Sequence, residues 1–300
     1  MKNLKKRKHH MKLTTADLVF HILNWILLTV FLIVLTYPLL YVVISSFTSG
    51  SMLPLNLIPK KTTMQGYMAV FEYDLFWSGV TNSLINTCMA TMISLFVTIC
   101  CAYPLSRKEF KARGIVMALC VFTMYFSGGM IPGYLNIRNL GLLDSRFACF
   151  LPSAMNVYNM IIMRTYFMNS IPGELHEAAT IDGCDQFQRL IKVVLPLSVP
   201  VIAVIALFVA ASEWNSYFGP MLYLDSKELY PLSLVLRQIL IDNTIDSTSV
   251  VDPNTLAMMT KRRQTMKYAI IVVSSIPMIV VYPFIQKHFT KGMMIGAVKG

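Results

Sequence analysis

The sequence is poor in charged residues. Only 14% of its 300 residues are Asp, Glu, Lys or Arg, and 55% are hydrophobic, which gives a mean hydropathy of +0.58. Ordinary globular chains carry roughly 25% charged residues. A soluble fold with so little charge would expose too much apolar surface to water. The composition therefore excludes an ordinary soluble protein and predicts that lipid solvates much of the chain.

Sequence signatures of common catalytic centres are also absent. The chain contains no G-x-x-x-x-G-K-[ST] phosphate-binding loop, no H-E-x-x-H and no C-x-x-C, and its five histidines are scattered. The six cysteines lack metal-ligand spacing, and most lie in apolar runs, where a thiol behaves as a small hydrophobe. We therefore expect a non-catalytic chain that binds no metal and no cofactor directly.

Basic residues give the chain a net charge of +11, and their positions indicate what that charge does. Six of them lie in the tail 1–17, before the first apolar segment, and four lie in the connector 105–114. This pattern orients membrane proteins, because short segments rich in Lys and Arg stay in the cytoplasm. We therefore expect a multi-pass protein with both termini in the cytoplasm and no binding of nucleic acid.

Six segments are apolar enough to cross a bilayer as helices, which takes about 20 residues each. Helices are the expected form because they satisfy their own backbone hydrogen bonds in lipid. The sequence predicts an all-α integral membrane protein with a basic tail 1–17, a transmembrane domain 18–289 and a C-terminal tail 290–300. The expected spans are about 18–45, 80–104, 115–135, 147–168, 198–223 and 267–289.

The predicted cytoplasmic loop 169–197 carries strong local signals. Pro172 suits the first turn of a helix, and Gly183 suits the left-handed position that ends one. Asp185 can cap a second helix, 186–195, which Pro196 follows. The loop is therefore expected to form a short helix, a sharp turn and a second helix that leads back into the membrane.

Small and acidic side chains on the first of these helices admit two interpretations. Glu174 and Glu177 lie near its N-terminus, where they favour the helix dipole. Ala178 and Ala179 leave room for another surface to approach the helix backbone. The helix is then either a docking element or a solvated connector of the kind that tolerates most polar sequences. Residue types alone leave both interpretations open.

A longer motif in the same loop resembles a known family. Glu177-Ala178-Ala179, three residues, Gly183, nine residues and then Val193-x-Leu195-Pro196 resemble the "EAA" loop of ABC importer permeases. The resemblance implies that 172–195 holds a coupling helix, which fits a cleft on an ATPase subunit. The residues expected to carry the coupling are Glu174, Glu177, Ala178, Ala179, Asp182, Gly183, Leu195 and Pro196.

Further segments resemble the carbohydrate-uptake, maltose-importer-like branch of that family, and within it the subgroup associated with complex oligosaccharides. They are Phe126–Pro132, Asn139–Asp144, Glu213–Asn215, Tyr282–Gly292 and Gly296–Gly300. The resemblance implies the type I ABC importer fold with six transmembrane helices, in the bacterial cytoplasmic membrane. The implied partners are a second homologous permease, two ATPase subunits that hold ATP and Mg, and an extracellular lipid-anchored solute-binding protein. By similarity to the maltose importer, Lys299 and Gly300 are expected to contact the ATPase dimer.

Polar side chains inside the predicted spans are candidates for a substrate path. A carboxylate such as Glu213 costs about 2.5–3.5 kcal/mol at the centre of a membrane helix, so we expect it to face a cavity or a partner. Amides and an indole ring suit the hydroxyls and ring faces of sugars, but polar stripes also hold helices together. Both interpretations stay open. The candidates are Glu213, Trp214, Asn215, Asn156, Asn159, Asn82 and Asn86.

Three alternative functions are compatible with the composition. A permease of an ABC importer for a non-sugar solute would keep the loop and change the cargo. An ion-driven secondary transporter would predict inverted repeats, and none is visible in the sequence. An intramembrane enzyme would need Glu213 and Asp182 within reach of each other, although the predicted spans place them on different sides of the bilayer interior.

Overall fold

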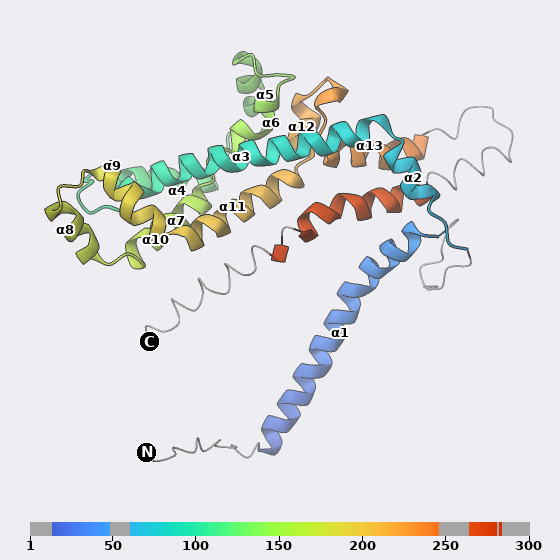
Figure 1. The fold of residues 1–300 in the computed structure, drawn as a ribbon, viewed down its shortest axis with the longest axis horizontal. Helices are drawn as coiled ribbons and strands as arrows, with labels where there is room; N and C mark the ends of the chain where they lie inside the picture. Colours follow the sequence, from blue (N-terminus) through green and yellow to red (C-terminus); the bar gives the residue numbers. More distant parts are fainter. Residues whose placement is uncertain (1–13, 49–60, 246–263, 281, 284–300) are drawn as a thin grey trace.

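A computed structural model describes residues 14–48, 61–245, 264–280 and 282–283 (Figure 1). Every regular element in these ranges is helical, and one isolated β-bridge joins Thr48 to Thr62. The all-α fold predicted from the sequence is confirmed.

The described helices follow one another in chain order. They are α1 (Thr15–Ser46), α2 (Gln65–Phe71), α3 (Asp74–Ser106), α4 (Arg113–Tyr125), α5 (Met130–Asn139), α6 (Arg146–Phe150), α7 (Val157–Asn169), α8 (Gly173–Ile181), α9 (Gln186–Arg189), α10 (Leu195–Leu197), α11 (Val199–Trp214), α12 (Phe218–Tyr223), α13 (Leu232–Ile245) and a final helix, Gln264–Val280. Single turns of 3₁₀-helix cover Leu151–Ser153 and Lys227–Leu229, and a π-helical segment covers Leu190–Val194.

Several predicted spans are broken rather than continuous. Among the described residues, α1 and α3 are long and apolar enough to cross a membrane alone, and two bent helix pairs raise the number of such spans to four. The predicted span 115–135 is wrong as a single helix, because α4 and α5 meet at 113° around Gly129, whose φ of +92° is incompatible with a continuing helix. The predicted spans 147–168 and 198–223 are likewise divided, into α6 and α7 and into α11 and α12.

Helix α3 forms the centre of the bundle. It runs along the length of the bundle with α7 and α11 beside it, and α13 packs against it as well (Figure 1). Met160, Met163 and Ile205 are fully buried in the apolar cluster that joins these helices near the end of α3. A second cluster, around Phe76 and Trp214, joins the beginning of α3 to α13 and the final helix.

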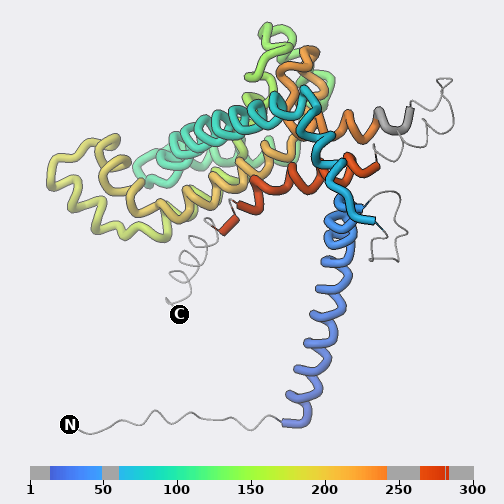
Figure 2. The backbone as a smooth tube through the Cα atoms, turned by 45° about the vertical axis from the view of Figure 1, so that its right-hand side comes forward, coloured from blue at the N-terminus to red at the C-terminus, as the bar shows by residue number. Residues whose placement is uncertain are grey.

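Helix α1 diverges from this bundle in both views (Figures 1 and 2). A capping box between Thr14 and Asp17 fixes its beginning, and none of its most apolar stretch is buried within the chain. Its contacts with the rest of the molecule include the hydrogen bond between the Ser46 hydroxyl and the Tyr67 hydroxyl (2.7 Å). Its apolar surface is therefore left for lipid or for another subunit.

Two polar links hold the segment after α12 against the beginning of the bundle. Asn82 on α3 donates to the backbone carbonyls of Glu228 (2.6 Å) and Tyr230 (3.0 Å), and it accepts a hydrogen bond from Arg146 (2.7 Å). Asp144, at φ +53°, accepts hydrogen bonds from Ser226 that hold the pKa of its carboxyl below the ordinary value. This end of α3 is therefore fixed by side chains from distant parts of the chain.

We expect Gly66→Ala to destabilise the fold. A Cβ atom at Gly66 would lie 2.7 Å from the backbone oxygen of Thr265, so α2 and the final helix would have to separate. Overpacking of this kind costs about 1–3 kcal/mol, which thermal unfolding of the purified protein would show as a lower Tm. The matched control is Gly114→Ala, because no atom lies within 4 Å of that position. Equal Tm values for the two variants would contradict the prediction.

Candidate functional site: the 172–197 loop and an interior cavity

The first helix of the 172–197 loop ends in a glycine cap, as its sequence predicts. Gly183 has a φ of +75°, its N–H donates to Thr180 O (3.1 Å), and the next N–H, of Cys184, donates to Ala179 O (2.9 Å). These two bonds form a Schellman motif, which satisfies carbonyls that the helix itself leaves open. Pro172 stands at the other end of α8 as its N-cap residue. The glycine turns the chain sharply towards the second helix.

The second helix begins at Asp185 and extends beyond its predicted end. Asp185 accepts a hydrogen bond from the backbone N–H of Gln188 (2.7 Å) and forms a capping box with it. The chain then passes through the π-helical segment Leu190–Val194 into α10, which contains Pro196. A proline clashes with the carbonyl of the preceding turn, and the wider π-turn relieves that clash. Helical structure therefore continues through Pro196 before the chain bends by 81° into α11.

The exposed surface of α8 is both acidic and apolar. Glu174, Glu177, Ala178 and Asp182 are exposed, and Ile181 beside them is 87% exposed. Two further apolar side chains, Leu175 and Phe187, are 40% and 68% exposed. The sequence analysis overlooked these three apolar residues, although isolated large apolar residues in a charged loop are the signal that would have revealed them. Large apolar side chains that are this exposed are available for contact with another protein.

Ala179 does not belong to that exposed surface. Its side chain is 6% exposed and packs towards the chain's own interior, and His176, one turn earlier on the same side of α8, is 9% exposed. The expectation that both alanines leave room for a partner is therefore wrong for Ala179. A helix with a 3.6-residue period turns adjacent residues by about 100°, so Ala178 and Ala179 point in different directions.

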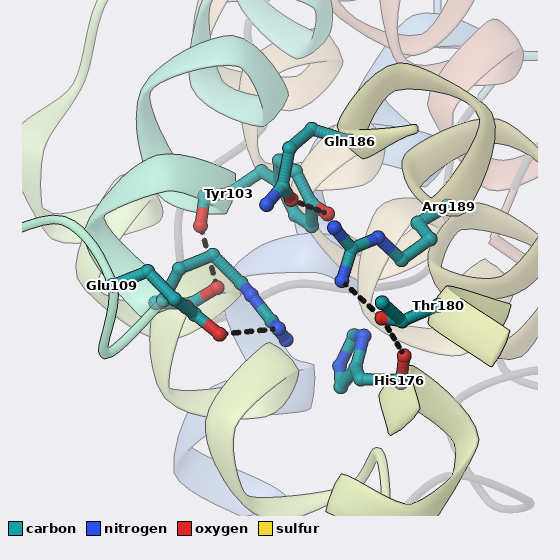
Figure 3. A network of polar contacts seen from close by, with 8 residues as sticks. Tyr103, Glu109, His176, Thr180, Gln186 and Arg189 are labelled. Atoms are coloured by element: carbon teal, nitrogen blue, oxygen red, sulfur yellow. Dashed lines mark hydrogen bonds and ion pairs between the residues drawn. The ribbon is translucent and has the colours of Figure 1, made fainter. Parts of the chain in front are cut away.

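Hydrogen bonds attach the loop to the end of α3 (Figure 3). The Tyr103 hydroxyl of α3 donates to the Gln186 side chain (3.1 Å). Arg189 donates to the Thr180 hydroxyl (3.0 Å), and that hydroxyl donates to His176 O (2.8 Å), so α9 is tied to α8. Sequence reasoning missed these residues because nothing in a single chain indicates which side chains meet across helices. The loop is therefore connected to the bundle by side chains as well as by its backbone.

An interior cavity of about 260 Å³ lies between α3, α7 and α11. Three of the predicted substrate-path residues line it, namely Asn156, Asn159 and Glu213. The side-chain oxygen of Asn156 caps α7 by accepting the N–H of Asn159 (3.1 Å). Ser94 also lines the cavity, and its buried hydroxyl has no hydrogen-bond partner among the described residues. The cavity thus combines a carboxylate, amides and a hydroxyl with the aromatic side chains of Phe150, Tyr158 and Phe208.

The other predicted substrate-path residues lie elsewhere. The Trp214 indole is buried between helices and donates to Ser274 O (3.2 Å), and Asn215 donates to Ala211 O on its own helix (2.7 Å). Asn82 holds the segment after α12, as described above, and Asn86 is buried with its side-chain oxygen unpaired among the described residues. The interpretation as interhelical contacts therefore fits Asn82 and Trp214. Lys299 and Gly300 lie outside the described residues.

The geometry also bears on the enzyme hypothesis. Asp182 caps α8 in the loop, whereas Glu213 lies near the far end of α11, a helix of 16 residues or roughly 24 Å. The two carboxylates therefore do not form a catalytic pair in this structure.

Comparison with known proteins identifies the class to which this fold and loop belong. Residues 11–295 match the family described as "Binding-protein-dependent transport system inner membrane component". The chain belongs to this family of transport permeases, and it is a membrane protein.

The similarity to individual relatives extends over nearly the whole length of the chain. Protein LplC of Bacillus subtilis (strain 168) is 39% identical over 97% of this chain and 99% of its own length. The polygalacturonan/rhamnogalacturonan transport system permease protein YtcP of the same organism is 40% identical over 94% of this chain and 99% of its own. A crystal structure of a bacterial ABC transporter involved in the import of the acidic polysaccharide alginate includes a chain with a TM-score of 0.82 and 36% identity, covering 92% of this chain and 98% of that one. The type I ABC importer permease fold predicted from the sequence is confirmed.

We expect the two alanines of α8 to respond differently to enlargement. Ala179→Leu places a larger side chain in a packed interior and is expected to cost about 1–3 kcal/mol, measured as a lower Tm. Ala178→Leu lies on the exposed surface and is expected to change stability by less than about 0.5 kcal/mol. A larger loss of Tm in Ala178→Leu than in Ala179→Leu would contradict the orientation of α8.

Proposed function

We propose that this chain is the permease subunit of an ATP-driven importer for an oligosaccharide. The observation that carries the proposal is α8, a short helix ended by Gly183, which bears exposed acidic and apolar side chains. It is attached to α9 through the hydrogen bond from Arg189 to Thr180, and α9 is attached to α3 through the hydrogen bond from Tyr103 to Gln186. The chain itself is non-catalytic, and ATP and Mg are bound and consumed on partner ATPase subunits. Family membership supports the transport role.

The proposed assembly contains four kinds of subunit. A second homologous permease pairs with this chain, and the exposed apolar surface of α1 supports such a pairing. Two ATPase subunits bind on the cytoplasmic side, one of them against the exposed surface of α8. An extracellular lipid-anchored solute-binding protein delivers the cargo, in keeping with the dependence on a binding protein that the family description names. Both termini lie in the cytoplasm.

The proposed mechanism is the transmission of ATPase movement through rigid helices. When the ATPase subunits close, they push α8, and the bonds through Thr180 and Arg189 make α8 and α9 move together. Tyr103 passes this movement to α3, a helix of 33 residues that also lines the interior cavity through Ala90 and Ser94. A displacement at the loop therefore changes the walls of the cavity and its access from either side.

The cargo is proposed from the cavity and from the relatives. Sugars present hydroxyls that bond to amides and carboxylates, and apolar ring faces that pack on aromatic rings. Asn156, Asn159 and Glu213 supply the first kind of group, and Tyr158 and Phe208 supply the second. One similar permease is named for polygalacturonan/rhamnogalacturonan transport, and a similar chain belongs to a transporter involved in alginate import, so both are associated with sugar polymers.

We expect Gly183→Val to uncouple the ATPase. Open space surrounds Gly183, so the cost arises from the positive φ, which a β-branched residue adopts only with a strain of about 1–2 kcal/mol. Retention of the ATPase during co-purification should fall roughly 5- to 30-fold, and ATP-dependent uptake into proteoliposomes should fall with it.

The matched control is Gly183→Asn, because asparagine tolerates the left-handed region. Its ATPase retention should stay close to that of the native chain. If Gly183→Val assembled and transported normally, α8 would not be the coupling element.

We expect Glu213→Gln to weaken transport without disturbing assembly. The substitution keeps the size of the side chain and removes its charge, so a charge-assisted hydroxyl hydrogen bond becomes a neutral one and is weakened by about 1–1.5 kcal/mol. The KM for oligosaccharide uptake should rise roughly 5- to 10-fold. Trp214→Phe is the control, because that indole lies outside the cavity lining and its loss should lower Tm rather than raise KM. An unchanged KM in Glu213→Gln would show that Glu213 does not contact the substrate.

A further inference from the structure

A second cavity lies where the end of α3 meets the 172–197 loop. Its volume is about 380 Å³, and its walls come from the connector after α3, the end of α7, and both α8 and α9. We call it the basic pocket. Its charged and polar lining consists of Ser106, Arg107, Lys108, Glu109, His176, Glu177, Thr180 and Arg189. Apart from the loop attachments already described, the proposed coupling mechanism makes no use of these groups.

The cations of the basic pocket exceed its carboxylates. Arg107 pairs with Glu109 (3.1 Å), which is the one ion pair among the described residues. Arg189 donates to the neutral Thr180 hydroxyl and has no carboxylate within ion-pair distance in the described part of the chain. Glu177 also lines the pocket, so two arginines and Lys108 face two carboxylates. A positive charge therefore remains without an internal counter-charge.

Buried polar atoms in the pocket are left without partners. The Nε atoms of Arg107 and Arg189 and the Nδ1 atom of His176 are all buried, and none has a hydrogen-bond partner among the described residues. The His176 side chain is nine-tenths buried. Its burial and the two neighbouring guanidinium groups lower the pKa of His176 from its ordinary value. The two guanidinium Nε–H groups are donors, and buried donors normally have a partner, so the arrangement indicates that an anion completes the pocket.

We propose that the basic pocket binds the phosphate headgroup of an anionic phospholipid. Arginine guanidinium groups match a phosphate with parallel N–H donors, and charge-assisted bonds of this kind are the strong ones. Arg107 comes from the connector after α3 and Arg189 from α9, so one phosphate can accept bonds from both elements. In Figure 3, the side chains of Glu109 and Arg189 lie on opposite sides of the cluster of polar residues, and His176 lies near the lower edge of that cluster.

The surroundings favour a lipid over a soluble phosphate compound. Beside the basic pocket is a mostly apolar groove of about 360 Å³ that shares Arg107 and Glu109 with it. The remaining lining of the groove is Tyr103, Pro104, Phe110, Gln186, Phe187 and Leu190. The basic pocket and the groove both lie at the end of α3. In the proposed orientation, this end of the membrane helix reaches the cytoplasmic headgroup layer. Basic pockets at this level bind the headgroups of anionic lipids. A lipid fills the groove with an acyl chain, whereas a soluble phosphate leaves it empty.

A bound headgroup would stiffen the link between α3 and the coupling loop. The Tyr103–Gln186 hydrogen bond between them is neutral, and the phosphate would add charged contacts to Arg107 on one side and to Arg189 on the other. This part of the inference rests on the proposed function, because it places the loop on the cytoplasmic side and in contact with the ATPase. Anionic lipid is then expected to raise the coupling of ATP hydrolysis to transport.

The test measures lipid retained by the complete transporter. The assembly is reconstituted in phosphatidylcholine with or without phosphatidylglycerol and re-extracted in detergent without ATP, and its bound lipid is quantified by mass spectrometry. The native assembly is expected to retain phosphatidylglycerol, and the double variant Arg107→Gln/Arg189→Gln to retain roughly tenfold less or lower still. The matched control, Lys111→Gln/Arg113→Gln, removes the same amount of charge at two positions outside the pocket lining and should retain lipid like the native chain.

Two further arms keep the result decisive. If the glutamine pair folds poorly, as judged by Tm, Arg107→Lys/Arg189→Lys is the second variant. It keeps the charge but not the parallel N–H donors, so it is expected to retain more lipid than the glutamine pair and less than the native chain. Soluble glycerol 3-phosphate is added as a competitor, and it should displace little phosphatidylglycerol because it leaves the groove empty. Equal retention in the glutamine pair and in its control, or full displacement by glycerol 3-phosphate, would overturn the proposal. Lipid retention is measured without ATPase turnover. A negative result would therefore contradict the lipid site alone, whereas a negative result with Gly183→Val would contradict the proposed coupling role of α8.

Discussion

The packing of α3 is the constraint on which the rest of the structure depends. One unbroken helix of 33 residues contacts α7 and α11 along its length and carries polar attachments near both of its ends. Asn82 fixes the segment after α12 near its beginning, and Tyr103 holds the 172–197 loop near its end. The interior cavity lies between these two attachments, against Ala90 and Ser94. Because packed helices move as rigid bodies rather than bending continuously, a displacement at one end of α3 also moves the cavity wall and the other end of the helix.

The breaks in the other helices complement this continuous element. Irregular backbone inside a membrane protein is tolerated where protein or a cavity surrounds it. The extended residue Asn156, between the turn Leu151–Ser153 and α7, is an example, because it both caps a helix and lines the cavity. The end of α11 near Glu213 is another. Asn156 and Glu213 are therefore placed where helices begin and end, while the continuous α3 contributes Ser94 to the cavity from its interior turns.

Local signals explain how much of this arrangement could be predicted from the sequence. The limits of α8 depend on Pro172 and Gly183, and the start of the next helix depends on Asp185, so a few residues within one short segment were sufficient. The direction of a side chain depends on distant partners instead. Trp214 points to the final helix and Glu213 to the cavity, although the two residues are adjacent in the chain. The predicted span 115–135 failed for a related reason, because hydropathy measures how apolar a segment is and not whether its backbone continues through Gly129.

The isolation of α1 has a consequence for biogenesis. A helix whose backbone bonds are internally satisfied is stable in lipid by itself, and helix association is a separate, later stage of membrane protein folding. Among the described residues, the contacts of α1 with the rest of the chain lie at its end, where Tyr41 meets Tyr268 and Ser46 bonds to Tyr67, so the remainder of the helix requires no tertiary neighbour during insertion. The newly made α1 can thus insert into the bilayer before any partner subunit is present. Synthesis of this subunit therefore need not coincide with synthesis of a subunit that later packs against α1.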